Sequence, residues 1–123
     1  MIKNLLLVGL GGGVGSMLRY FTSVCLSRHN LFCFPWATFT VNILGCLLMG
    51  VVLGVVHKHE LFNNDLRILF TIGFCGGFTT FSAFSSENLR LFEGGNYHIG
   101  IIYIVSSVLL GIAAIWFGNW IVK

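Results

Sequence analysis

The chain has 123 residues, of which 56% are hydrophobic and 9% charged, and its mean hydropathy is +0.90. Soluble domains carry about 25% charged residues, so this composition excludes a soluble protein and indicates an integral membrane protein. The net charge of +3 is small and scattered along the chain, which argues against binding to nucleic acid.

Four apolar stretches are each long enough to cross a bilayer, which takes about 20 residues as a helix. The connections between them are short and leave no room for a soluble domain. We therefore predict one all-α membrane domain over residues 1–123. Its expected spans cover residues 2–26, 36–56, 66–91 and 98–122.

The first span combines a glycine-rich stretch with a buried charge. The small residues between Gly9 and Ser16 are three and four apart, which predicts a face for close helix packing. Their spacing does not match a G-x-G-x-x-G nucleotide loop. Arg19 lies well inside the span, where burial in lipid costs at least ~2.5 kcal/mol. It is interpreted either as an interfacial anchor or as a positive group near an anion entrance.

The second span carries a polar side chain at bilayer depth. Asn42 needs hydrogen-bond partners there, so it either joins two helices or donates its NH₂ group to a passing solute. The residues alone favour the first interpretation. Gly50 and Gly54 form a G-x-x-x-G pair, which is typical of a helix packing face.

The third span is interrupted in its middle. The run from Gly73 to Phe84 contains a glycine pair, a threonine pair and four phenylalanines, where a regular membrane helix is expected. Non-helical backbone at this depth is tolerated only inside protein or beside a water-filled cavity. We therefore predict a helix break and, beside it, an ion site.

Beyond the break, a resumed helix would place Phe81 and Phe84 on one face, because they are three residues apart. Phe78 would share this face only if the helix were already regular there. Glu87 follows about one turn later. It is interpreted either as the partner of Arg90 in an interfacial salt bridge or as part of a pore vestibule.

The fourth span is apolar apart from a few hydroxyl groups. Tyr103 and Ser107 lie one turn apart and are candidates for a hydroxyl ladder, although serine in a membrane helix also bonds to the backbone. Trp116, Trp120 and Lys123 at the end of the span indicate an interfacial belt.

The charges in the connections show only a weak bias between the two sides of the membrane. With four spans, both termini share one side with the second connection. That side holds Lys3, Lys58, Arg67 and Lys123, and the other side holds Arg28 and Arg90. Orientation follows the Lys/Arg bias, so this chain could insert either way round, which permits an antiparallel dimer of identical subunits.

Three parts of the sequence occur in an order and at a spacing typical of one family. They are Gly12–Ser16 with Arg19 and Tyr20, Thr38–Asn42 with Gly45, and Gly73–Phe84. Together they resemble the CrcB/Fluc family of fluoride channels over essentially the whole chain. The resemblance implies a four-helix subunit with a broken third helix, in an antiparallel dual-topology homodimer that has two fluoride pores.

The resemblance also implies site residues. A structural Na⁺ at the dimer centre would be held by the main-chain carbonyls of Gly76 and Thr79. Arg19 matches an arginine of the family and is expected in a vestibule. The expected pore and fluoride-binding residues are Asn42, Phe81, Ser82, Phe84, Glu87, Tyr103 and Ser107.

Two positions depart from the family pattern. Ala83 stands where the family usually has threonine, so one hydroxyl of the polar track is missing, and either slower conduction or a different route is expected. Val108 stands where some relatives have a polar residue, which weakens the placement of Tyr103 and Ser107 on the track.

The resemblance implies a passive fluoride channel, not an enzyme, that exports fluoride across a bacterial inner membrane. Its partners would be fluoride, a second copy of the chain and the lipid bilayer. A small proton-coupled exporter of the multidrug type is the alternative, but it would need an acid in the first span, whose ionisable groups are Lys3 and Arg19. A structural subunit of a larger complex is the other alternative.

Overall fold

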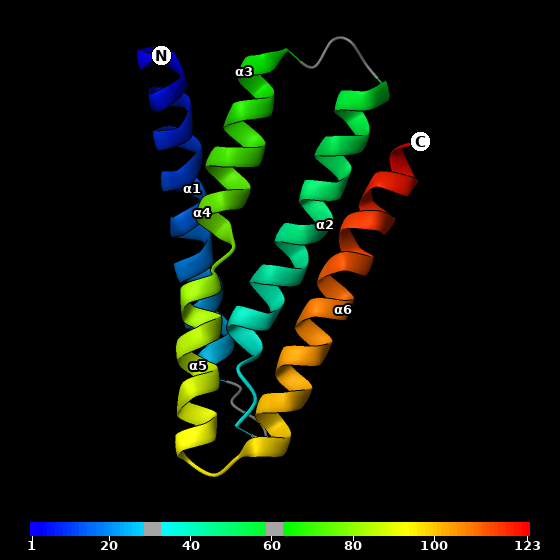
Figure 1. Cartoon of the computed structure of the whole chain (residues 1–123). Helices are drawn as coiled ribbons and strands as arrows, with labels where there is room; N and C mark the ends of the chain where they lie inside the picture. Colours follow the sequence, from blue (N-terminus) through cyan, green and yellow to red (C-terminus); the bar gives the residue numbers. More distant parts are fainter. Residues whose placement is uncertain (29–32, 59–62) are drawn as a thin grey trace.

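A computed structural model describes residues 1–28, 33–58 and 63–123. These residues form helices and no strand, and four helical segments are long and apolar enough to cross a membrane. The segments lie side by side, with the N- and C-termini at the same end (Figure 1). The elements are α1 (Ile2–Ser27), α2 (Trp36–Lys58), α3 (Asn64–Arg67), η1 (Ile68–Cys75), α4 (Gly76–Phe78), α5 (Phe81–Glu93) and α6 (Tyr97–Val122).

The predicted number of spans is confirmed, and the helices run slightly beyond several of the predicted limits. The third span, Asn64–Glu93, consists of four elements. Asn63 precedes it as the N-cap residue, and its side chain accepts a hydrogen bond from the N–H of Leu66. Asparagine favours this position because it satisfies an N–H that the first helical turn leaves unpaired.

The third span also contains a π-helix, which the sequence analysis did not predict. This element, η1, runs from Ile68 to Cys75 and leads directly into the short helix α4. π-Helical turns are rare and occur frequently at functional sites. Here α4 (Gly76–Phe78) separates the π-helix from the break in the span.

The first span has the predicted face for close helix packing, and its partner is the third span. A Cβ atom on Gly11 would collide with the main chain of Leu69, and one on Gly15 with the main chain of Phe74. The absence of side chains lets the two backbones approach, which is how small residues join membrane helices. The broken span is therefore supported closely by α1.

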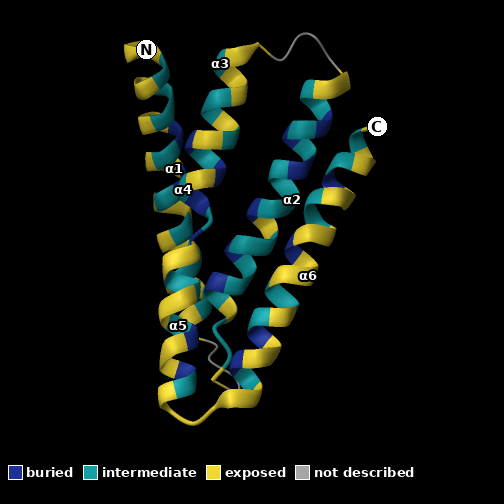
Figure 2. Ribbon diagram, viewed as in Figure 1, coloured by how far each residue is buried: buried dark blue, intermediate teal, exposed yellow. Residues whose placement is uncertain are grey.

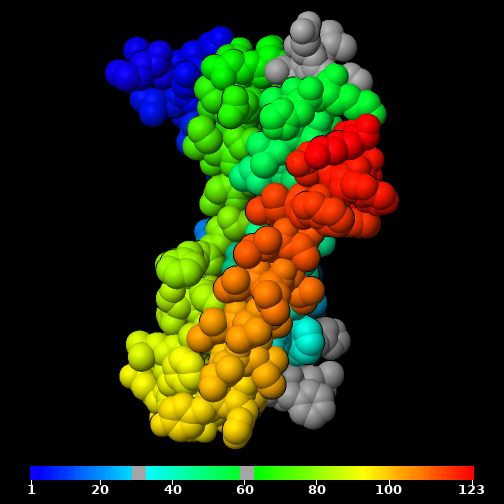
Figure 3. All heavy atoms as spheres, turned by 45° about the vertical axis from the view of Figure 1, so that its right-hand side comes forward, coloured from blue at the N-terminus to red at the C-terminus, as the bar shows by residue number. Residues whose placement is uncertain are grey.

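The second and fourth spans pack through a matching set of glycines. A Cβ atom on Gly50 would collide with the main chain of Ile115, and one on Gly118 with the main chain of Leu47. The predicted G-x-x-x-G packing face is thus confirmed, and its partner is α6. In the space-filling view, α6 lies beside α2 in its upper part and beside α5 in its lower part (Figure 3).

Buried residues are few and are spread along the helices (Figure 2). The largest fully buried side chains are Tyr103, Val41 and Cys75. Of these three, Tyr103 carries a hydroxyl group, which needs a hydrogen-bond partner when it is buried.

The basic residues are divided between the ends as expected. By their positions in the elements, Lys3, Lys58, Arg67 and Lys123 fall at the end with both termini, and Arg28 and Arg90 fall at the opposite end. Figure 1 shows how these elements are arranged. Lys3 is paired, since its Nζ lies 2.8 Å from the Asp65 carboxylate.

Candidate functional site

The break in the third span occurs at the two threonines rather than at the preceding glycines. Thr79 (φ −84°, ψ 157°) and Thr80 (φ −151°, ψ 117°) are both extended, whereas Gly76 and Gly77 remain helical. Helix resumes at Phe81, and the Thr80 side chain caps it by accepting a hydrogen bond from Ala83 N–H. The predicted break is therefore compatible with the structure.

Asn42 of α2 holds this break in place. Its Oδ1 accepts a hydrogen bond from Thr80 N at 2.8 Å, and its Nδ2 donates to Thr80 O at 3.1 Å. The Asn42 side-chain amide thus pairs the N–H and C=O groups of Thr80, which an unbroken helix would pair with adjacent turns. An amide nitrogen carries two hydrogens, so one remains beyond the bond to Thr80.

Two main-chain carbonyls at the break lose the N–H that a continuous helix would offer them. The N–H four residues after Gly76 belongs to Thr80 and donates to Asn42. The N–H four residues after Thr79 belongs to Ala83 and donates to the Thr80 hydroxyl. Gly76 is also exposed, and a Cβ atom there would meet nothing within 4 Å.

Phe81 and Phe84 lie in the first turn of α5. Their ring centroids are 5.8 Å apart with an interplanar angle of 37°. Phe81 is 79% exposed, which is high for an aromatic side chain in the middle of a span. Phe78 lies before the break and stacks on Phe74, so it does not continue this pair.

A cavity of about 280 Å³ lies beside the break. Its lining brings together Asn42, Cys46, Thr80, Phe81, Phe84 and Ser107. The Ser107 hydroxyl is buried and has no hydrogen-bond partner in the described part of the chain. Since buried polar groups are nearly always paired, this hydroxyl is available to a solute in the cavity. Val108 contributes an apolar wall.

Glu87 connects three spans through its two carboxylate oxygens. Oε1 accepts a hydrogen bond from the Thr38 hydroxyl at 2.6 Å, and Oε2 accepts one from the Tyr103 hydroxyl at 2.8 Å. Thr38 was not among the predicted site residues. Its position four residues before Asn42, on the same face of α2, was the signal that could have identified it.

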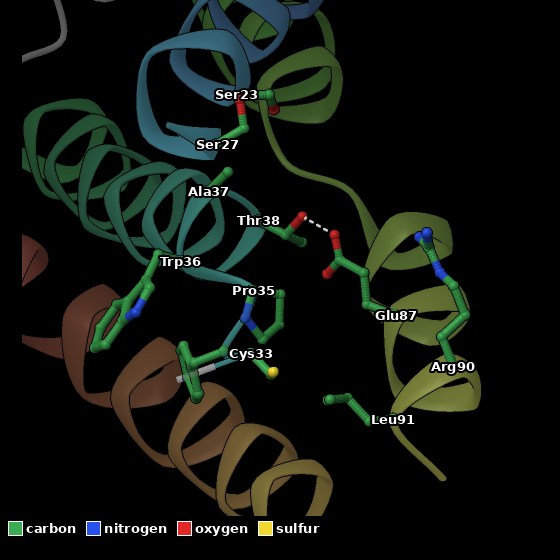
Figure 4. Close-up of a pocket in the computed structure, with 11 residues that line it drawn as sticks. Ser23, Ser27, Cys33, Pro35, Trp36, Ala37, Thr38, Glu87, Arg90 and Leu91 are labelled. Carbon is green, nitrogen blue, oxygen red and sulfur yellow. Dashed lines mark hydrogen bonds between the residues drawn. The ribbon is translucent and has the colours of Figure 1, made fainter. Parts of the chain in front are cut away.

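A larger cavity of about 510 Å³ adjoins this group, and polar side chains from three spans line it. Figure 4 shows Glu87 directed toward Thr38, with Arg90 extending from the same helix and Ser23 and Ser27 approaching from α1. The carboxylate is thus bonded to hydroxyl groups while Arg90 lines the same cavity. The vestibule interpretation of Glu87 stays a prediction.

Arg19 lines a third cavity, of about 230 Å³, between α1, α2 and α5. Ser23 and Thr38 line this cavity as well as the larger one. Ala83 also faces it, so the hydroxyl that a threonine would carry is missing from this wall rather than from the cavity beside Phe81.

The structure divides the predicted site residues into groups. Asn42, Phe81, Phe84, Ser107 and Thr79 line the cavity at the break. Tyr103 and Glu87 form the hydrogen-bonded group beside it, and Arg19 lies in the third cavity. Ser82 is exposed, and its hydroxyl lies 3.3 Å from that of Thr80.

Comparison with known proteins identifies the family. A sequence profile described as "CrcB-like protein, Camphor Resistance (CrcB)" matches residues 6–119. The chain belongs to the CrcB family. Several CrcB relatives are similar over almost their whole length and are named fluoride-specific ion channel FluC. The protein from Phocaeicola vulgatus is 50% identical over 119 residues, which cover 97% of this chain and 98% of the relative.

Two further CrcB relatives carry the same name. The protein from Azobacteroides pseudotrichonymphae is 45% identical, over 96% of this chain and 94% of its own. The protein from Flavobacterium psychrophilum is 43% identical, over 99% of this chain and 98% of its own. The predicted family is therefore confirmed, and this chain is a multi-pass membrane protein of a family whose named members are ion channels.

Proposed function

We propose that this chain forms a passive, fluoride-selective channel. The relatives named fluoride-specific ion channels support this assignment. The observation that carries it is the break at Thr79 and Thr80, which Asn42 holds open beside a cavity lined by Phe81 and Phe84. Polar groups and irregular backbone are thus concentrated at bilayer depth, where they would be costly without a solute pathway.

Fluoride is strongly hydrated, so a channel must replace its water with comparably good donors. In the cavity at the break, the second N–H of Asn42 and the unpaired hydroxyl of Ser107 serve as donors. The rings of Phe81 and Phe84 add the positive edges of their π-systems. These groups attract a small anion and offer no negative charge to a cation.

The route continues from this cavity to the group around Glu87. The Thr38 and Tyr103 hydroxyls bond to the carboxylate in the structure, and each can turn toward an arriving fluoride instead. Arg90 lines the adjoining cavity and offsets the negative charge of Glu87. Arg19 attracts anions into the third cavity, which Thr80 and Ala83 also line next to the break.

The functional unit is an antiparallel homodimer. Gly76, Phe81, Ser82 and Ser85 are all exposed on one subunit, although they lie within the third span. Exposed hydroxyls and freed carbonyls are unfavourable against lipid, so a second copy that covers this face stabilises them. The weak charge bias between the two ends permits both orientations.

The residues at the break fit a Na⁺ ion shared by the two subunits. The carbonyls of Gly76 and Thr79 lack the N–H partners of a continuous helix, and carbonyls freed at a broken membrane helix are suitable oxygen ligands for Na⁺. The open space around Gly76 allows the second subunit to approach. When bound, the ion supplies positive charge that stabilises the carbonyl ends of both breaks.

The channel serves fluoride export across a bacterial inner membrane. Hydrogen fluoride enters cells from acid, ionises at the internal pH and is trapped as the anion. A membrane potential that is negative inside favours anion exit by about 2.3 kcal/mol per 100 mV. A passive pathway is therefore sufficient for export.

Fluoride efflux from liposomes that contain only this purified protein tests the proposal. We expect fast release to a fluoride electrode and negligible release of chloride under the same gradient. Absence of fluoride release from dimeric protein in Na⁺ would refute a self-sufficient channel. Equal release of fluoride and chloride would refute selectivity.

A further inference from the structure

Phe34 lies in the connection before α2. Among the described residues, its ring contacts three other aromatic rings. The centroid of Phe34 is 5.2 Å from Tyr103 with an interplanar angle of 73°, and 5.3 Å from Phe39 with an angle of 77°. The third contact is with Trp36, at 4.5 Å.

Tyr103 is held between Phe34 and Phe84. The centroid of Phe84 lies 4.9 Å from that of Tyr103, at an angle of 60°. Both contacts are edge-on, which is a favoured geometry for aromatic pairs. The Tyr103 side chain is fully buried, and its hydroxyl donates to Glu87 at 2.8 Å. Phe39 is a third ring beside Tyr103, at 6.4 Å, so the direction of this hydroxyl depends on the surrounding rings.

Phe34 also lines the cavity of about 510 Å³ that Thr38, Glu87 and Arg90 share. A row of ring contacts thus runs from Phe81 through Phe84 and Tyr103 to Phe34, and it ends at this cavity. We propose that Phe34 is a positioning residue, whose ring fixes the Tyr103 hydroxyl at the end of the anion route. The inference rests on the proposed channel function for its effect on flux.

The role of Phe34 requires a ring rather than volume alone. A leucine fills similar space but has no ring edge or face, so Tyr103 gains freedom to turn away from Glu87. A donor that must be reoriented for each passing ion is less effective than one held in place. Phe34→Leu is therefore expected to lower fluoride flux roughly three- to tenfold, and Phe34→Tyr to keep most of it.

A double-mutant comparison tests whether Phe34 acts through the Tyr103 hydroxyl. Flux is measured for Phe34→Leu in the wild-type chain and in a Tyr103→Phe chain. We expect Phe34→Leu to lower flux in the wild-type chain and to change it little further in the Tyr103→Phe chain, because the effects of coupled residues are not additive. An equal loss in both chains, or no loss in the first, would overturn the proposal. Phe117→Leu is the matched control, since Phe117 is 47% exposed and stacks on Trp120 near the end of α6.

A second readout does not depend on transport. The chain has three tyrosines, so 3-fluorotyrosine labelling gives few ¹⁹F signals, and Tyr103→Phe identifies that of Tyr103. Phe34→Leu should shift or broaden this signal, and Phe117→Leu should leave it unchanged. An unmoved signal would overturn the positioning role. If the wild-type protein releases no fluoride, the channel proposal fails while this measurement still decides the role of Phe34.

Discussion

Substitution of Asn42 by aspartate changes a side chain that makes two hydrogen bonds to the break. Asn42 accepts from Thr80 N and donates to Thr80 O, at 2.8 and 3.1 Å. An aspartate keeps the acceptor but sets a carboxylate oxygen against the Thr80 carbonyl. It also removes the second N–H, which we propose donates to fluoride, and adds a negative charge to the anion route.

The size of the effect follows from the charge. Two unit charges about 4 Å apart repel by roughly 4 kcal/mol at an effective dielectric constant of ~20. Since about 1.4 kcal/mol in a barrier changes a rate tenfold, fluoride flux should fall by roughly three orders of magnitude. The lost bond to Thr80 leaves a buried carbonyl unpaired, which costs about 1–3 kcal/mol of stability.

The assay is fluoride efflux from liposomes, with dimer content measured by size-exclusion chromatography before reconstitution. Asn4→Asp is the matched control, because it makes the same chemical change in the first turns of α1, away from the break. This control should conduct normally. Wild-type flux through folded Asn42→Asp would refute the reasoning and leave Asn42 as a purely structural contact between α2 and the break.

Three other predictions concern the rings, the ion and the helix packing. Phe81→Ile or Phe84→Ile should lower fluoride flux at least tenfold without dissociating the dimer, because the ring edges are lost; unchanged flux would remove these rings from the route. Replacement of Na⁺ by K⁺ should impair flux reversibly, because K⁺ is larger than the proposed carbonyl site suits; indifference to this exchange would contradict the central ion. Gly50→Ala should lower the unfolding free energy in detergent by about 1–3 kcal/mol, because its Cβ would collide with the main chain of Ile115.

The packing prediction has a matched control in the same chain. Gly13 lies in α1, and a Cβ atom there would meet nothing within 4 Å. Gly13→Ala should therefore be neutral or slightly stabilising, since alanine favours a helix more than glycine does. Equal destabilisation by both substitutions would show that the collision with α6 is not the cause.

Several features were predictable from the sequence because they depend on local composition. The four spans follow from apolar length, and their number places both termini at one end. The packing faces at Gly11 and Gly50 follow from the spacing of small residues. The break was expected between Gly73 and Phe84 because glycine and hydroxyl residues interrupt an apolar run there. The roles of the pore residues and of Na⁺ stay predictions, supported by resemblance.

Other features depend on how the helices are placed against one another, so only the tertiary structure decided them. From the sequence alone, either of two residue pairs could leave the helix, because Gly76–Gly77 and Thr79–Thr80 are both weak helix formers. Asn42, in another span, stabilises the break at the threonines by bonding to both main-chain groups of Thr80. In the same way, Glu87 bonds to Thr38 and Tyr103 from two other spans, although Arg90 is nearer in sequence. The physical reason is that a buried polar group takes the partners that packing brings within hydrogen-bond distance, whatever their separation along the chain.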